Sequence, residues 1–197
     1  MAVNTALPRH ALALLDTIYD TESGGRYNII YGGGTFSDYS DHPRQLITIR
    51  NGLNKGKKTS ASGAPQFTAP TWDRAKKALG LSDFKPTSQD AAAWWLAQSD
   101  YKRRTGQNLL SDLQTESGEV IAIIGAKLSP TWTSLPNGIE QTTKSSDFVR
   151  RYFSHLAKYQ GNKPKNDVIE PRQDAPEEKA KQGRSDQLLN QNYLNNL

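Results

Sequence analysis

Glu22 is the residue whose position, as well as its type, favours chemistry. Leu15, Ile18 and Tyr19 precede it by seven, four and three residues, which places all four side chains on one face of a helix. Burial on that face and the negative end of the helix dipole both shift a carboxyl group toward its neutral form. A carboxylic acid that keeps its proton near neutral pH can protonate the leaving oxygen of a glycosidic bond. Position alone leaves one alternative open, in which Glu22 lies beyond a fraying helix end and points into water.

The sequence gives little support for other kinds of catalytic centre. It has no cysteine, which removes disulfides, thiolate nucleophiles and thiolate metal sites. The three histidines, His10, His42 and His155, lie on separate segments without metal-ligand spacing. There is no Gly-x-Ser-x-Gly elbow and no phosphate-binding loop. We therefore expect carboxylate chemistry, with no metal and no cofactor.

Helices dominate the predicted secondary structure, with one small β-lobe near the start of the chain. Leu7-Pro8 opens the helix that carries Glu22, and Gly24-Gly25 ends it. The β-rich segments 27–31 and 45–49 predict an antiparallel sheet or hairpin within residues 27–67. Later helices are expected to begin at Thr71, Ser88, Ser117, and Ser145 or Ser146. This order predicts an α+β fold.

The apolar residues become sparse near residue 160, which divides the chain into two parts. Residues 1–160 are predicted to form one catalytic domain and residues 161–197 a polar tail. Residues 161–184 have almost nothing to bury and should be disordered or extended in isolation. Leu189, Tyr193 and Leu197 recur every four residues and predict a short docking helix at 185–197. The alternative for this end of the chain is a frayed tail.

The positive charge lies in the first part of the chain. Residues 1–160 hold 19 Lys and Arg against 14 Asp and Glu, whereas residues 161–197 hold six of each. Such a surface suits an anionic polymer, although an ordinary solvated surface has the same composition. The basic runs are short and no zinc pattern accompanies them, so nucleic acid is not expected as a partner.

Targeting signals are also missing from the sequence. The N-terminus lacks the basic, apolar and small-residue regions of a secretory signal. No stretch approaches the roughly 20 apolar residues that a membrane-spanning helix needs. We expect a soluble protein that reaches any target outside the cytoplasm with help.

A series of short motifs covers about residues 10–158. They include Asp20-Thr21-Glu22-Ser23-Gly24-Gly25, Phe36-Ser37-Asp38-Tyr39-Ser40-Asp41-His42-Pro43-Arg44, Ser62-Gly63-Ala64-Pro65-Gln66-Phe67, Leu79-Gly80-Leu81-Ser82-Asp83-Phe84 and Trp132-Thr133-Ser134-Leu135-Pro136. In order and in spacing, this series resembles the phage lambda-type endolysins. The resemblance implies a lytic transglycosylase of glycoside hydrolase family 104 with a lysozyme-like fold.

The resemblance implies that Glu22 is the catalytic glutamate. Enzymes of this family cut peptidoglycan between N-acetylmuramic acid and N-acetylglucosamine without water. The muramyl 6-hydroxyl attacks its own anomeric carbon and leaves a 1,6-anhydro sugar. An internal nucleophile removes the need for the second carboxylate of most glycosidases, so one glutamate can act first as acid and then as base.

The resemblance also implies a set of substrate-binding residues. Gln66 matches a glutamine that lines the sugar cleft, and an amide can both donate to and accept from a saccharide. The chain departs from the family at Ala64-Pro65, where an aromatic residue is usual, which puts one sugar subsite in doubt. Further candidates for substrate contact are Asp38 and the aromatic residues Tyr31, Tyr39 and Trp72, which are equally compatible with a place in the core.

Two alternatives to a transglycosylase remain open at this point. Asp38 or Asp41 can supply a second carboxylate, which would make the protein a hydrolytic muramidase, although residues of this loop more often hold backbone N–H groups. His42 is expected to be a structural hydrogen-bonding residue. In the other alternative, the protein is a virion-associated tether that carries a lysozyme-like module.

The expected locations are the host cytoplasm, with holin-dependent release to the periplasm, or the virion.

Overall fold

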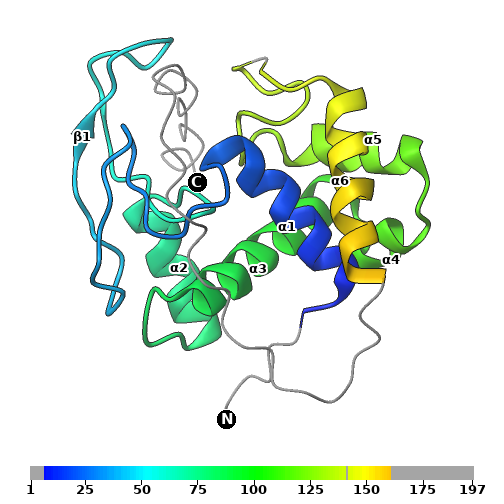
Figure 1. Ribbon diagram of the computed structural model, residues 1–197, viewed down its shortest axis with the longest axis horizontal. Helices are drawn as coiled ribbons and strands as arrows, with labels where there is room; N and C mark the ends of the chain where they lie inside the picture. The colour runs from blue at the N-terminus through cyan, green and yellow to red at the C-terminus, as the bar shows by residue number, and fades with distance from the viewer. Residues whose placement is uncertain (1–6, 141, 161–197) are drawn as a thin grey trace.

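The computed structural model describes residues 7–140 and 142–160 of the chain. This part is mostly helical with one small antiparallel hairpin, so the α+β prediction is confirmed. Figure 1 shows the hairpin at one side of the molecule and the helices at the other. In chain order the elements are α1 (Arg9–Glu22), β1 (Ile47–Thr48), β2 (Lys58–Thr59), α2 (Ala69–Leu79), α3 (Pro86–Thr105), α4 (Leu109–Gln114), α5 (Gly118–Leu128) and α6 (Ser145–Gln160).

Helix α1 is the centre of the hydrophobic core. Leu14, Leu15 and Ile18 are completely buried, and α1 contacts α3, α4 and α6. A helix that is buried on most of its circumference belongs to the interior of a domain. Figure 1 shows α1 crossing the middle of the molecule, with α6 beside it. The residue at its C-terminal end, Glu22, is therefore held by the best-packed element of the described chain.

The β-lobe, residues 27–67, contains less regular structure than the sequence predicts. Ile47 pairs with Thr59 and Thr48 with Lys58 in the antiparallel hairpin. The predicted strand 27–31 forms only isolated bridges, from Ile29 to Thr35 and from Ile30 to Ser62. The chain reverses directly after Tyr31, which leaves no partner strand of comparable length. Tyr31, Ile49 and Ala61 instead form a second, smaller core.

Two of the expected helix starts are wrong by two or three residues. Helix α2 begins at Ala69 after Thr68, and α3 begins at Pro86, because a proline in the first turn has no amide hydrogen to leave unpaired. The hydroxyl of Ser88 donates to Asp83 at 2.6 Å instead of capping α3. The predicted cap at Ser117 is confirmed, since its Oγ accepts from the Val120 amide at 3.5 Å. The short helix α4 was not predicted.

The predicted tail, residues 161–197 with its docking helix at 185–197, lies outside the described residues. Within the described ranges, none of the helices is long and apolar enough to cross a bilayer.

Gln89 on α3 joins the helices to the β-lobe. Its side chain is completely buried, and its Oε1 accepts from the Ala64 amide at 2.9 Å. Its Nε2 donates to the carbonyl oxygens of Tyr27, at 3.1 Å, and Phe84, at 2.8 Å. One amide group thus satisfies three backbone groups from three segments. Gly63, beside Ala64, has to lack a side chain, because a Cβ there would lie 2.3 Å from Gln89 Oε1.

A pair of glycine substitutions tests this junction. Gly63 and Gly33 both have a positive φ, of 78° and 94°, but a Cβ on Gly33 would meet nothing within 4 Å. Gly33→Ala is expected to lower the free energy of unfolding by about 1–2 kcal/mol through backbone strain alone. Gly63→Ala is expected to lower it by about 3 kcal/mol or more, because the methyl group also displaces Gln89. Urea unfolding measures both values, and equal losses would show that the Gln89 junction contributes nothing.

Candidate active site

Glu22 is the last residue of α1 and is buried. Its exposed fraction is 8%, so the alternative in which it points into water is wrong. The backbone amide of Ser23 still donates to the Tyr19 carbonyl at 2.9 Å, which shows that the helix end does not fray. Figure 1 places this end of α1 between the β-lobe and the segment that follows α5. The carboxyl group is thus held where two parts of the fold meet.

Ser134, in the segment after α5, is the partner of the Glu22 carboxyl group. Its Oγ donates to Glu22 Oε1 at 2.5 Å and also lies 2.9 Å from Thr21 Oγ1. The backbone N–H of Ser134 makes a further hydrogen bond to Glu22. All of these contacts join residues more than a hundred positions apart in the sequence. The segment after α5 therefore positions the carboxyl group that α1 carries.

The hydroxyl of Ser134 can serve both protonation states of Glu22. When the carboxylate is ionised, Ser134 donates its single hydrogen to Oε1. When Glu22 is protonated, the acid can donate to Ser134 Oγ while Ser134 donates to Thr21 Oγ1. The hydrogen of Thr21 is already directed to the Ile18 carbonyl at 2.8 Å, so Thr21 Oγ1 is free to accept. Either state is satisfied without movement of heavy atoms.

Burial raises the pKa of Glu22 to about 7, because removal from water disfavours the anion. The hydrogen bonds from Ser134 stabilise the anion and oppose this rise. No cation among residues 7–140 and 142–160 contributes to the shift. A carboxyl group with a pKa near neutrality can both give and take a proton at physiological pH.

The loop that carries Gln66 is tied to the same segment as Glu22. Trp132 donates its Nε1 hydrogen to the Pro65 carbonyl at 3.2 Å, two residues before Ser134. Gln66 has a φ of 50°, and its Nε2 donates to the Gly63 carbonyl at 2.9 Å. Segment 132–134 therefore contacts both Glu22 and the predicted substrate loop. The nearly complete burial of Gln66 leaves little of its own surface for a saccharide.

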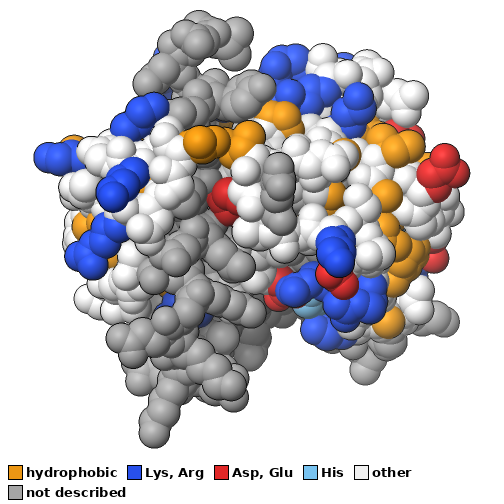
Figure 2. Space-filling model, turned by 90° about the horizontal axis from the view of Figure 1, so that it is seen from above, with side chains coloured by type: hydrophobic (Ala, Val, Ile, Leu, Met, Phe, Trp, Pro, Cys, Tyr) orange, Lys and Arg blue, Asp and Glu red, His pale blue; other side chains and the backbone are white. Residues whose placement is uncertain are grey.

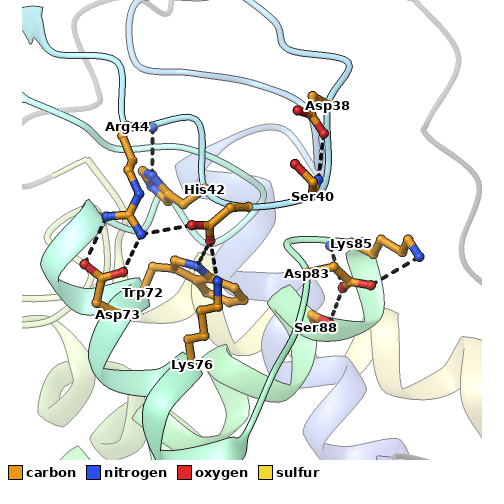
Figure 3. A network of polar contacts seen from close by, with 11 residues as sticks. Asp38, Ser40, His42, Arg44, Trp72, Asp73, Lys76, Asp83, Lys85 and Ser88 are labelled. Atoms are coloured by element: carbon orange, nitrogen blue, oxygen red, sulfur yellow. Dashed lines mark hydrogen bonds and ion pairs between the residues drawn. The ribbon is translucent and has the colours of Figure 1, made fainter.

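Asp38 and Asp41 both accept hydrogen bonds that hold their loop, and Figure 3 shows the one between Asp38 and Ser40. Asp38 is exposed, and its Oδ1 accepts from the Ser40 backbone N–H at 2.8 Å. Asp41 Oδ1 accepts from Trp72 Nε1 at 2.8 Å and from Lys76 Nζ at 3.0 Å. Its Oδ2 accepts from the Arg44 guanidinium at 3.1 Å. Such hydrogen bonds fix the position of the loop that carries Asp38 and Asp41.

The same hydrogen bonds set the charge of these two carboxyl groups. Partial burial raises the pKa of Asp41, but the hydrogen bonds from Trp72, the His42 backbone, Lys76 and Arg44 together lower it well below its usual range. The hydrogen bond from the Ser40 backbone is the main cause that lowers the pKa of Asp38. Both groups are therefore anions at neutral pH, in contrast to Glu22.

His42 has the structural environment expected from the sequence. Its Nε2 donates to the Phe67 carbonyl at 2.8 Å, and its Nδ1 accepts from the Arg44 backbone N–H at 3.0 Å. Burial lowers its pKa, which keeps the ring neutral. Both ring nitrogens are used, so His42 has no nitrogen left to act as a base.

The three aromatic candidates differ in their access to solvent. Trp72 is completely buried against Phe67 and Phe84, so neither face of its ring is open to a sugar. Tyr31 is also buried, in the small core of the β-lobe. We therefore assign Trp72 and Tyr31 to the core, in correction of the sugar-stacking role considered for them. Tyr39 is only partly buried, with its ring centroid 5.1 Å from that of Phe36.

Known proteins provide the family assignment. A family model described as "Endolysin" matches residues 12–159, which is most of the chain. The chain belongs to the endolysin family. Among the described residues of this endolysin-family chain, no group of three or more His, Asp or Glu side chains is placed to hold a metal ion.

Individual relatives agree with this family assignment. The endolysin of Escherichia phage lambda is 38% identical over 110 residues, which cover 56% of this chain and 61% of that protein. The endolysin of Escherichia phage P2 is 33% identical over 102 residues, which cover 51% of this chain and 56% of that protein. The chain thus spans less than two thirds of each of these relatives.

Solved structures agree with the predicted fold class. Bacteriophage lambda lysozyme complexed with a chitohexasaccharide is similar with a TM-score of 0.62 and 31% identity, over 76% of this chain and 95% of that one. A second structure of lysozyme from bacteriophage lambda has a TM-score of 0.55 and 29% identity, over 79% of this chain and 94% of that one. The lysozyme-like fold predicted from the sequence is confirmed.

Ser134 is the site residue that sequence reasoning missed. It occurs in one of the motifs that carry the family resemblance, but its residue type and its distance from Glu22 in the chain predict no role. A serine hydroxyl is a common side chain with no chemistry of its own at neutral pH. Only the approach of the segment after α5 to the end of α1 reveals it.

The raised pKa of Glu22 predicts a pH-dependent stability. The folded protein keeps this proton up to about pH 7, whereas the unfolded chain releases it near its ordinary value of 4.5. The free energy of unfolding therefore decreases as the pH rises between these values. Glu22→Gln lacks this decrease, so its stability relative to wild type should increase by about 3 kcal/mol in total as the pH rises from below 4.5 to above 7.

Urea unfolding at several pH values measures this difference. Asp38→Asn serves as the control, because a carboxyl group with a lowered pKa does not titrate between pH 5 and pH 7.5. Its stability relative to wild type should stay constant over that range. A constant difference for Glu22→Gln as well would contradict the raised pKa.

Removal of the Ser134 hydroxyl should raise the pKa of Glu22 further. Ser134→Ala deletes the side-chain hydrogen bond that stabilises the anion, while burial is unchanged. Ser134→Thr keeps a hydroxyl group and should keep the pKa near that of wild type. Carbon-13 NMR titration of the Glu22 carboxyl group measures each value. An unchanged or lower pKa in Ser134→Ala would show that the hydroxyl does not stabilise the anion.

Proposed function

We propose that the protein is an endolytic peptidoglycan lytic transglycosylase that cleaves the bond between N-acetylmuramic acid and N-acetylglucosamine. The observation that carries the proposal is the buried Glu22 carboxyl group, with a pKa of about 7 and a hydroxyl partner that suits both of its protonation states. Membership of the endolysin family supports peptidoglycan as the substrate. The chitohexasaccharide in the complex of phage lambda lysozyme supports a glycan chain as ligand.

In the proposed reaction, Glu22 acts twice. Protonated Glu22 donates its proton to the glycosidic oxygen, which leaves as the 4-hydroxyl of N-acetylglucosamine. The Glu22 carboxylate then accepts the proton of the muramyl 6-hydroxyl while that oxygen bonds to the anomeric carbon. The products are a chain with a 1,6-anhydro end and a chain with a free 4-hydroxyl, and no water is consumed. Glu22 ends the cycle protonated, as it began.

The environment of the other two carboxylates favours this reaction over hydrolysis. A muramidase needs a second carboxylate as nucleophile or as base for a water molecule. Asp41 accepts hydrogen bonds from an indole, an ammonium and a guanidinium group, which make its anion a weak base. Asp38 is engaged with its own loop. We therefore assign both carboxylates to loop structure. Asp38 and Tyr39, which keep exposed surface, remain candidate substrate contacts, whereas Gln66 has little surface of its own to offer a saccharide.

The place of action is part of the same proposal. We infer that the protein acts on the bacterial cell wall during phage-driven lysis or wall penetration. Holin-dependent release from the host cytoplasm and carriage in the virion are the two routes to the wall. In the second route, carriage in the virion, a protein partner binds residues 161–197.

Digestion of purified peptidoglycan tests the proposal. Wild type should release fragments with anhydro ends, which are lighter than reducing ends by one water molecule. Glu22→Gln should lower the rate by about 10² to 10⁴-fold, because the proton donor is lost. Asp38→Asn and Asp41→Asn should give the same anhydro products within about tenfold of the wild-type rate. Mass spectrometry identifies the ends, and reducing ends alone would establish the hydrolytic muramidase instead.

A further inference from the structure

The outward face of the β1–β2 hairpin combines cations with an exposed leucine. Side chains alternate along a strand, so Leu46, Thr48 and Arg50 point to the side opposite Ile47 and Ile49. Ile49 is buried in the small core, which makes the Leu46 side the outer one. Lys58 is the partner of Thr48 across the hairpin and therefore shares this outer face. Leu46 is 64% exposed there.

The loop at the tip of the hairpin also combines an exposed leucine with cations. Leu53 is 83% exposed, which is the largest value among the exposed large hydrophobic residues of the described chain. Lys55 and Lys57 follow it and are exposed as well. We call the exposed surface formed by the Leu46 side of the hairpin and by its tip loop the hairpin face. It comprises Leu46, Arg50, Leu53, Lys55 and Lys58. We count with it the exposed Lys57 next to Lys58, although the Lys57 carbonyl accepts from the Ile49 amide and Lys57 therefore lies opposite Ile49.

The charge of the hairpin face is of one sign. The sequence contains no Asp or Glu from His42 to Trp72, a stretch that holds all four cations of this face. None of the four takes part in the ion pairs among the described residues. Figure 2 shows Lys and Arg side chains gathered along the edge of the molecule on which Figure 1 places β1. Four cations that form no ion pair with the described residues attract an anionic partner.

The two leucines decide between the classes of anionic partner. Single-stranded nucleic acid is bound with aromatic side chains that stack on the bases, and the sequence has no aromatic residue from Ser40 to Gln66. The carboxylates of peptidoglycan stem peptides attract lysines but gain nothing from exposed leucines. A membrane surface that contains anionic lipids uses both, because cations pair with the headgroups while apolar side chains enter the acyl boundary.

We propose that the hairpin face binds the surface of a bilayer that contains anionic phospholipids. The leucines insert at the headgroup level, and Arg50, Lys55, Lys57 and Lys58 contact the lipid phosphates. This contact is peripheral, and it needs no membrane-spanning helix. It holds the enzyme beside the membrane that faces its substrate. The binding does not depend on the chemistry of Glu22, so it stands or fails separately from the proposed function.

Vesicle flotation of the full chain tests the proposal. The Glu22→Gln protein is mixed with vesicles of phosphatidylglycerol and phosphatidylethanolamine, or of phosphatidylcholine alone. It should float with the first and not with the second. The combined change Lys55→Gln, Lys57→Gln and Lys58→Gln should weaken binding by roughly a hundredfold. Leu53→Ser, which keeps every cation, should weaken it by about tenfold.

A matched control removes the same charge elsewhere. Lys77→Gln, Lys102→Gln and Lys127→Gln change three exposed lysines on α2, α3 and α5. This protein has the same net charge as the hairpin variant and should bind the anionic vesicles within about threefold of the parent. All changes are on exposed side chains, so equal unfolding temperatures exclude a folding defect.

Three outcomes would overturn the proposal. Equal binding to phosphatidylcholine vesicles would remove the role of lipid charge. An equal loss of binding in both triple variants would reduce the effect to net charge. In the third outcome, the protein does not float with the vesicles but is retained on membrane-free peptidoglycan, and the hairpin changes abolish that retention. This result would assign the face to the wall polymer instead.

Discussion

The burial of one carboxyl group, with no cation of the described chain beside it, is the constraint on which the site depends. Glu22 and Asp41 show what the environment does to the same functional group. Asp41 is surrounded by donors that include Lys76 and Arg44, and its pKa falls. Glu22 has the neutral hydroxyl of Ser134 as its side-chain partner, so burial prevails and its pKa rises to about 7. Environments that separate the pKa values of two carboxyl groups also separate their roles.

Such a group costs stability, and the rest of the fold has to hold it in place. The central helix α1 supplies a rigid base, because its apolar residues are buried on most sides. Segment 132–134 closes over its end, with Trp132 bonded to the Pro65 carbonyl and Ser134 bonded to Glu22. Gln89 fixes the start of the same loop from α3. Three distant parts of the chain thus converge at the buried Glu22 carboxyl group.

The β-lobe has two faces with different physical tasks. Its inner side packs Tyr31, Ile49 and Ala61 into a small core. Its outer side is exposed in the described part of the chain, which leaves the choice of residues free for cations and leucines. A short hairpin can present such a face because its strands alternate strictly between the two sides.

The amino-acid order determined the local features of this protein. The spacing of Leu15, Ile18 and Glu22 predicts their common helix face, and the order of elements predicts an α+β fold, because both depend on neighbours in the chain. The places of Ser134, Trp72 and Gln89 depended on tertiary structure, because each acts through contacts with residues far away in the sequence. The burial of Glu22 was also decided by tertiary structure. A glutamate at the same helical position would be ionised in the ordinary way if the segment after α5 did not cover it.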